Sequence, residues 1–205
     1  MLLVSGATAT LRRIRDPHLG RLLRPGNGNR PDDLPWAADN GAFSGFDPRA
    51  FAALLDAIAG HPGCLWAAAP DVVASSDGTD ALFAEWEPRI HALGLPVAYV
   101  GQDGLRSPPW ESLECLFIGG STEWKLGRTA EVLSREARRR GKLVHVGRVN
   151  TRRRFRAAMI IGADSVDGTA FSRFPDTQIP RALAWLREME PQCILPYVEQ
   201  RKEAE

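Results

Sequence analysis

The sequence predicts an α/β fold, and within that class a compact (β/α)8 TIM barrel. Three observations support this prediction: short apolar runs recur with the length of buried strands, helical patterns separate most of them, and a glycine follows most of the helices. An open doubly wound sheet is the alternative. The eight runs are Leu2–Ser5, Trp36–Asp39, Cys64–Ala69, Val97–Val100, Cys115–Ile118, Leu143–Val146, Ala163–Val166 and Cys193–Leu195.

The segments between these runs carry the periodicity of helices with one apolar face. The first predicted helix begins with Asp47 as a cap and Pro48 in the first turn, a favoured start. Left-handed C-terminal caps favour glycine, and Gly60, Gly94, Gly141 and Gly162 are placed to supply them. The predicted helices are 48–59, 79–93, 129–140, 151–161 and 177–188.

Two crossovers are expected to be irregular. The first, about residues 10–35, is rich in Arg, Pro and Gly, and the fourth, Leu105–Leu113, is too short for an ordinary helix. The 205 residues lie near the lower limit for a barrel of this type and contain no recognisable repeat or linker. We therefore interpret residues 1–205 as a single domain.

Composition limits the class of protein. No run approaches the roughly 18 apolar residues of a membrane span, and the first residues lack a basic leader, so the expected location is the cytoplasm. Cys64, Cys115 and Cys193 stand alone without a C-x-x-C pair, which predicts core cysteines and no structural zinc. Basic residues are concentrated between Lys125 and Arg156, either as a phosphate-binding surface or as the solvated faces of two helices.

Polar or glycine residues stand at the ends of six successive predicted strands. In a parallel barrel these ends share one face, and active sites lie there. Each residue alone could belong to a turn or a helix cap, but the six together indicate one pocket. They are Asp39, Asp71, Gln102, Gly119-Gly120, Gly147-Arg148 and Asp167.

These residues resemble the motifs of the tRNA-guanine transglycosylase superfamily. Asp39-Asn-Gly-Ala-Phe43 is similar to the family's Asp-Ser-Gly-Gly-Phe, and Gly101-Gln-Asp-Gly104 to its Gln-Gly-Gly segment. Ile118-Gly-Gly-Ser121 resembles a Gly-Gly segment of the family. Gly162-Ala-Asp-Ser-Val-Asp167 resembles Gly-Val-Asp-Met-Phe-Asp, whose last aspartate is the nucleophile. The resemblance runs in order from about residue 36 to residue 173.

The sequence departs from that family in lacking its C-terminal zinc site and most of the length used to grip tRNA. It is more similar to the compact, zinc-free phage and bacterial branch that places 7-deazaguanines in DNA, and Phe117–Gly127 looks typical of that branch. The resemblance implies a pentosyltransferase that replaces guanine by a free 7-deazaguanine base, with DNA favoured over tRNA. It implies no cofactor and no metal, and it allows a homodimer and accessory DNA-processing proteins as partners.

The exchange breaks one N-glycosidic bond and makes another at the same carbon, which a carboxylate nucleophile can divide into two easier steps. Asp167 is the preferred nucleophile. Asp164 is the competitor, but residues three apart on a strand point to opposite faces, so Ser165 rather than Asp164 would share the inward face. Asp164 is kept as a further substrate contact, or as an anchor of the barrel.

The remaining roles follow from the hydrogen-bonding groups of guanine. Asp71 can accept from N1–H and the 2-amino group, and Gln102 and the amides near Gly119 and Gly120 can donate to O6. Asp39 would be the acid/base or recognition carboxylate, with Asn40 and Phe43 as further contacts. The predicted phosphate contacts are Arg148, Arg152, Arg153 and Arg173.

Several alternatives remain open. His145 lies in an alternating strand and is interpreted as a core or lumen residue rather than a catalytic one. Trp66, Tyr99, Phe43 and Trp124 could stack on a base, although core packing is favoured for Trp66 and Tyr99. The chain could instead be an N-glycosidase or base exchanger on free nucleosides or nucleotides, or a non-catalytic barrel that binds nucleic acid.

Overall fold

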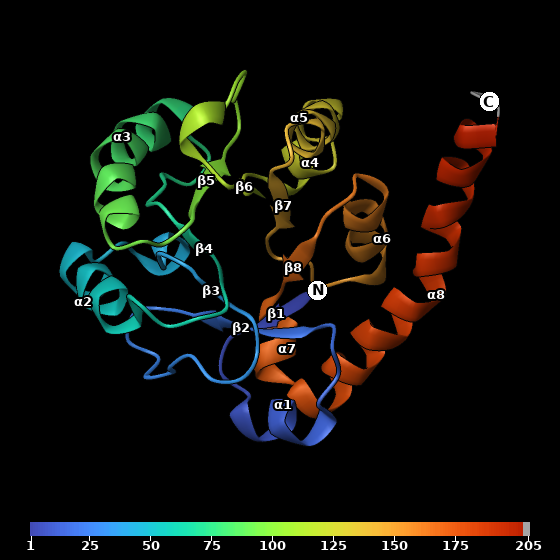
Figure 1. Ribbon diagram of the computed structural model, residues 1–205, viewed down its shortest axis with the longest axis horizontal. Coiled ribbons are helices and arrows are strands. Elements are labelled where there is room, and N and C mark those ends of the chain that lie inside the picture. The colour runs from blue at the N-terminus through green and yellow to red at the C-terminus, as the bar shows by residue number, and fades with distance from the viewer. Residues whose placement is uncertain (203–205) are drawn as a thin grey trace.

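The chain folds into a closed barrel of eight parallel strands, in agreement with the predicted fold class (Figure 1). The computed structural model describes the backbone of residues 1–202 and the side chains of residues 1–189. Each strand pairs with the next in sequence. The last closes the ring on the first, with Leu2 opposite Val166 and Leu3 opposite Asp167.

The strands are short and buried along most of their length, as expected for a parallel sheet that is covered on both faces. Their bounds are β1 Leu2–Val4, β2 Leu19–Leu23, β3 Trp36–Ala38, β4 Cys64–Ala68, β5 Val97–Gly101, β6 Cys115–Ile118, β7 Leu143–Val146 and β8 Ser165–Asp167.

Helices surround the strands, and the last helix runs along one flank of the barrel (Figure 1). The α-helices are α1 Thr8–Ile14, α2 Pro48–Ile58, α3 Ser76–Ala92, α4 Thr122–Lys125, α5 Arg128–Arg139, α6 Arg152–Ile160, α7 Thr169–Arg173 and α8 Pro175–Lys202. Two short 3-10 helices, η1 Ala42–Ser44 and η2 Trp110–Ser112, lie in loops. None of the described helices is both long enough and apolar enough to cross a bilayer.

Alternation along the strands divides the apolar residues into two clusters. One cluster fills the lumen, where Trp66 packs among small residues such as Ala37 and Ala98, with Phe117 beside it. The other lies between the outer faces of the strands and the helices. Because side chains plug the lumen, a ligand can bind only at an end of the barrel and not through it.

The predicted helix signals are confirmed. The Asp47 side chain accepts hydrogen bonds from the backbone N–H groups of Arg49 and Ala50, and Pro48 is in the first turn of α2. All four glycines expected to end helices have φ values from 71° to 79°, in the left-handed region. Trp66 and Tyr99 are fully buried, as core packing requires. Of the three predicted core cysteines, Cys115 is buried, Cys64 is half-buried, and the side chain of Cys193 lies outside the described residues.

One of the eight predicted strands is wrong. Cys193–Leu195 lies within α8, and the missing strand is β2, inside the crossover expected to be irregular. Gly20 and Arg21 interrupt the apolar pattern of β2. A Cβ at position 20 would lie 2.7 Å from both a Leu3 methyl and the Pro35 carbonyl oxygen, and the buried Arg21 guanidinium is bonded to Asp32. These contacts come from residues outside the strand, so its own sequence does not reveal them.

The two irregular crossovers differ in outcome. The segment 10–35 contains most of α1, all of β2 and a loop from 24 to 35, so only its second half is irregular. Between β5 and β6 the only helical element described is η2, which confirms that this crossover lacks an ordinary helix.

Candidate active site

A cavity of about 130 Å3 opens at the carboxyl ends of the strands. Four of the residues expected to meet line its wall, and each comes from a different strand end. Asp39 follows β3, Asp71 follows β4 by three residues, Gln102 follows β5, and Asp167 ends β8. The floor is apolar and consists of lumen residues, among them Leu3, Leu22, Val100 and Phe117. The cavity thus has an apolar base and a polar rim.

Asp71 is held by two side-chain amides from neighbouring loops. The Asn40 amide donates to Oδ1 at 2.8 Å and the Gln102 amide to Oδ2 at 2.6 Å. Burial raises the pKa of Asp71, although both amides act in the opposite direction. Each carboxylate oxygen accepts one bond here and retains further acceptor capacity. Asp71 can therefore accept hydrogen bonds from a ligand.

Gln102 and Asn40 are buried and serve mainly to position other groups. The Gln102 carbonyl oxygen accepts from the N–H groups of Ala74 at 2.9 Å and Gly120 at 3.0 Å, and Asn40 also donates to the Ala69 carbonyl at 2.8 Å. The sequence predicts that Gln102 donates to the ligand. In the structure one N–H of its amide donates to Asp71, which leaves at most the other N–H for a ligand.

Asp167 receives a hydrogen bond on each carboxylate oxygen. The Arg148 backbone N–H donates to Oδ1 at 2.9 Å, and His145 Nε2 lies 3.1 Å from Oδ2. The pKa of Asp167 is lowered: burial raises it, but the contact with His145 and the Arg148 N–H outweigh burial. Asp167 is therefore the ionised carboxylate of the cavity.

His145 is fully buried in the lumen between the rings of Trp66 and Phe117. Burial lowers its pKa, so the ring is neutral at pH 7. An ionised Asp167 can only accept, so Nε2 carries the proton, and Nδ1 accepts from the Ser165 hydroxyl at 2.8 Å. His145 is a lumen residue, as expected from the sequence, and it also orients Asp167.

Asp39 has the opposite electrostatic character. Its pKa is raised to about 6 by burial and by the negative charge of Asp167, despite Arg24, whose Nε lies 3.3 Å from Asp39 Oδ2. The Gly41 N–H donates to Asp39 Oδ1 at 3.3 Å. One cavity thus contains a carboxyl that holds its proton up to about pH 6 and another that ionises more readily than an ordinary aspartate.

Glycines let the backbone approach the cavity closely. A Cβ at Gly119 would lie 2.9 Å from Gln102 Nε2, and one at Gly147 would lie 2.5 Å from a ring carbon of Phe117. Gly120 has φ 64°, which side chains rarely adopt. At this part of the rim the wall is made by peptide groups.

Arg148 closes one side of the mouth. It has φ 59°, unusual for a residue with a side chain, and its guanidinium donates to the Gly120 carbonyl. The same guanidinium lies 4.6 Å from the centroid of Phe43, whose side chain is 68% exposed. Phe43 is thus available at the mouth as a flat apolar surface. Trp124 instead lies against Gly101 and Gly120, where added Cβ atoms would touch its ring.

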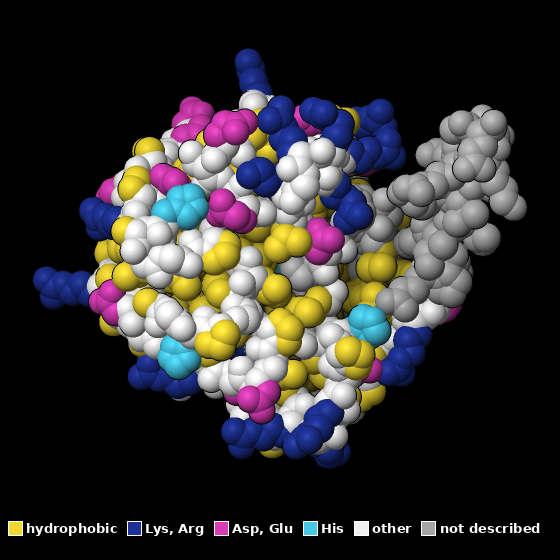
Figure 2. Space-filling model, in the orientation of Figure 1, with side chains coloured by type: hydrophobic (Ala, Val, Ile, Leu, Met, Phe, Trp, Pro, Cys, Tyr) yellow, Lys and Arg dark blue, Asp and Glu magenta, His cyan; other side chains and the backbone are white. Residues whose placement is uncertain are grey.

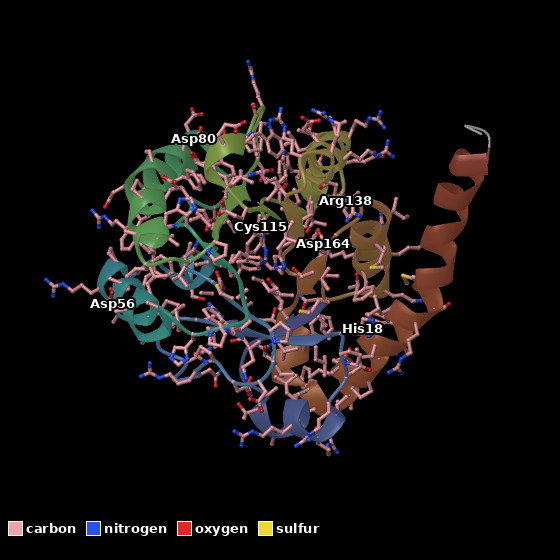
Figure 3. The ribbon with its side chains drawn as sticks, in the orientation of Figure 1. His18, Asp56, Asp80, Cys115, Arg138 and Asp164 are labelled. Carbon is pink, nitrogen blue, oxygen red and sulfur yellow. The ribbon has the colours of Figure 1, made fainter. Side chains whose placement is uncertain are left out.

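Asp164 does not reach the cavity. Its carboxylate lies at the other end of the barrel, where it accepts from the Val144 N–H at 2.8 Å and pairs with Arg138 at 3.2 Å (Figure 3). The assignment of Asp164 as a substrate contact is therefore corrected. Asp164 anchors β8 to β7 and α5, because it and Asp167 point to opposite faces of the strand.

Of the four predicted phosphate-binding arginines, Arg148 lines the cavity and the other three do not. Arg152 pairs with Glu188 on α8, and Arg153 and Arg173 are exposed. Figure 2 shows basic side chains gathered where α4 and α5 lie. Most of the α5 arginines form ion pairs with Glu131 or Glu136 on the same helix, which fits a solvated helix face.

Sequence reasoning missed Arg24 in the cavity wall and the buried Lys125 behind it, as well as the lining hydroxyl residues Ser5, Thr169 and Ser172. Arg24 was missed with β2, although Leu22-Leu23-Arg24-Pro25 has the same strand-to-loop pattern as the other strand ends. Lys125, 4% exposed, donates to the Gly147 carbonyl at 2.7 Å. A lone lysine between Trp124 and Leu126 was a usable signal of a buried cation.

Within the part of the chain with described side chains, no three His, Cys, Asp or Glu residues are grouped so that they could hold a metal ion. The polar side chains that line the cavity include carboxylates, amides and the guanidinium groups of Arg24 and Arg148. Compared with models of known protein families and with curated proteins, the sequence gives no match.

Proposed function

We propose that this protein is a base-exchange transglycosylase that replaces guanine by a 7-deazaguanine in nucleic acid, in DNA rather than tRNA. The observation that carries the proposal is the pair Asp39 and Asp167, which face one cavity with pKa values displaced in opposite directions. Carboxyls displaced in this way take the roles of acid and of nucleophile or stabiliser. The sequence resemblance implies the same role for Asp167 and makes Asp39 an acid/base or recognition carboxylate.

The first half of the exchange forms a covalent bond to the enzyme. An Asp167 oxygen attacks the sugar C1′, the C1′–N9 bond breaks, and its electron pair leaves with the purine. Protonated Asp39 supplies a proton to the departing base. In the second half, ionised Asp39 removes the proton from the incoming base, whose nitrogen attacks C1′ and releases Asp167.

The polar rim suits a guanine-like edge. Asp71 can accept from two adjacent donors. The N–H groups of Gly119 and Gly120 already donate to the Gly101 carbonyl and to Gln102 Oε1, which leaves the second N–H of the Gln102 amide as a donor for a ligand oxygen. The apolar floor matches a flat heteroaromatic ring, so the proposed base would meet a carboxylate acceptor and an amide donor at the rim.

The size of the cavity suits one flat group rather than a whole nucleotide. About 130 Å3 is well below the roughly 300–1,000 Å3 of pockets that enclose a whole drug-sized ligand. In the proposed function one base enters this space while its sugar and phosphates stay outside. An enzyme of this kind takes its target base out of the stack, and the exposed Phe43 ring is placed to stack on a neighbouring base.

The test is incorporation of labelled guanine into single-stranded DNA, double-stranded DNA, tRNA and free nucleosides. We expect incorporation into DNA. Asp167→Asn should reduce incorporation at least about a thousandfold and abolish the denaturant-stable protein–DNA adduct. Asp164→Asn is the matched control, because it makes the same change at the opposite end of the barrel.

Three results would contradict the proposal. Incorporation only into nucleosides would indicate a nucleoside base exchanger. DNA binding with no exchange by the folded wild-type protein would indicate a binding module. An adduct that forms equally in Asp167→Asn would remove the assigned nucleophile.

A further inference from the structure

Lys125 is a buried cation that the proposed chemistry does not use. It ends α4, in the segment Phe117–Gly127, and its ammonium donates to the Gly147 carbonyl oxygen at 2.7 Å. Burial, and the nearby charges of Arg148 and Arg154, lower its pKa to about 8. It still carries a charge at pH 7, in a place where a charge is costly.

A single peptide group connects Lys125 to the nucleophile. The carbonyl of the Gly147–Arg148 peptide accepts from Lys125, and the N–H of the same peptide donates to Asp167 Oδ1 at 2.9 Å. A trans peptide points its C=O and N–H in opposite directions, so the group lies between ammonium and carboxylate. A cation at the carbonyl end polarises the peptide and strengthens the N–H as a donor.

The connecting peptide is fixed in place. Gly147 is packed so tightly against Phe117 that a Cβ would lie 2.5 Å from the ring. Arg148 is held at φ 59° with its guanidinium on the Gly120 carbonyl, and Arg154 donates to the Arg148 carbonyl at 3.3 Å. With the peptide immobile, a change at Lys125 alters the hydrogen bond to Asp167 directly.

The charges around this chain of contacts favour the same conclusion. Lys125 is influenced by Arg148 and Arg154 and by the carboxylates of Asp167 and Asp103. Asp167 has neutral His145 on one side and, across the cavity, Asp39, whose positive partner is Arg24. Lys125 is thus a buried ammonium on the far side of the peptide that contacts Asp167.

We propose that Lys125 is a positioning residue that keeps Asp167 ionised and correctly oriented by acting through the Gly147–Arg148 peptide. The effect of Lys125 on the charge of Asp167 is argued from these contacts alone. The effect on base exchange rests on the proposed function. Lys125 touches neither the substrate nor the reacting atoms in this account.

The test follows Asp167 directly by carbon NMR of protein labelled at the aspartate carboxyl carbon, with the signal assigned by its loss in Asp167→Asn. In Lys125→Met the Asp167 carboxylate should titrate at a higher pH than in the wild type. Lys125→Arg should restore the wild-type midpoint. The matched control is Lys142→Met, which removes a lysine beyond α5, at the opposite end of β7, and should leave the midpoint unchanged.

Base exchange is the second readout. Protonation of Asp167 at low pH would then remove more of the nucleophile, so Lys125→Met should lose more of its rate, relative to the wild type, at about pH 5 than at about pH 8. If Lys125→Met does not fold, Lys125→Gln replaces it. This variant retains a donor for Gly147 without the charge, and its Asp167 midpoint should also rise.

An Asp167 midpoint that is the same in the folded neutral variants and the wild type overturns the proposal. If the neutral variants also lose the same fraction of the rate at every pH while the Asp167 midpoint is unchanged, Lys125 has a purely structural role. If the midpoint moves as expected but the wild-type protein exchanges no base, the proposed function fails while the role of Lys125 toward Asp167 stands.

Discussion

Asp39→Asn is expected to stabilise the protein near neutral pH while removing the proposed base exchange. The folded-state pKa of Asp39 is about 6, against 3.8 for an ordinary aspartate. At about 1.4 kcal/mol per pH unit, this gap corresponds to about 3 kcal/mol. A quarter of the side-chain surface is exposed, so solvent screening makes this an upper bound.

The direction with pH follows from linkage. Because the folded-state pKa is raised, the contribution of the neutral carboxyl to stability is complete below 3.8 and is lost as pH rises through about 6. Asparagine has the same shape and does not titrate. The free energy of unfolding of Asp39→Asn minus that of the wild type should therefore increase from about pH 4 to about pH 7, by up to about 3 kcal/mol.

Urea unfolding at several pH values measures this difference. Asp164→Asn is the control, since Asp164 makes its contacts at the far end of the barrel and its substitution should give a difference that does not follow the same pH window. If the difference in unfolding free energy between Asp39→Asn and the wild type stays constant from about pH 4 to 7, the surroundings of Asp39 do not disfavour its ionised form, and the reasoning is refuted. A gain in stability with a loss of exchange would be the trade-off expected of a functional carboxyl.

Two further predictions concern packing and the mouth of the cavity. Gly147→Ala should destabilise the fold by about 1–3 kcal/mol, because the new methyl would lie 2.5 Å from the Phe117 ring. An unchanged urea midpoint would contradict that close packing. Phe43→Ala should leave the melting temperature unchanged, since the side chain is 68% exposed, and weaken single-stranded DNA binding by about tenfold through lost stacking. A marked fall in melting temperature with intact DNA affinity would show that Phe43 is structural.

The strand ends could be predicted because they combine two local signals. Asp39, Asp71, Gln102 and Asp167 each end or follow an apolar run, and parallel topology then brings them to one face. The alternation of side chains along a strand also predicts that Asp167 and Asp164 point to opposite faces. These inferences need only the local sequence and the fold class.

The features that were missed depend on distant partners. In β2, the guanidinium of Arg21 can be buried because it donates a hydrogen bond to Asp32. Gly20 in the same strand has no room for a side chain, because Leu3 and Pro35 lie against it. The pairing of Lys125 with Gly147 joins α4 to the end of β7, and a sequence pattern gives no measure of that distance. Cys193–Leu195 has a strand-like composition, but three residues cannot be distinguished from a short stretch of a long helix by periodicity.

The triangle of Asn40, Asp71 and Gln102 has a consequence for how this protein can diverge. The three side chains belong to three separate loops, and Asp71 is bonded to both of the others. Replacement of Asp71 removes an acceptor from two buried amides, and replacement of either amide removes a donor from Asp71. Changes of preference at this rim should therefore arise as paired substitutions, and related chains that differ at one corner of the triangle should also differ at a second.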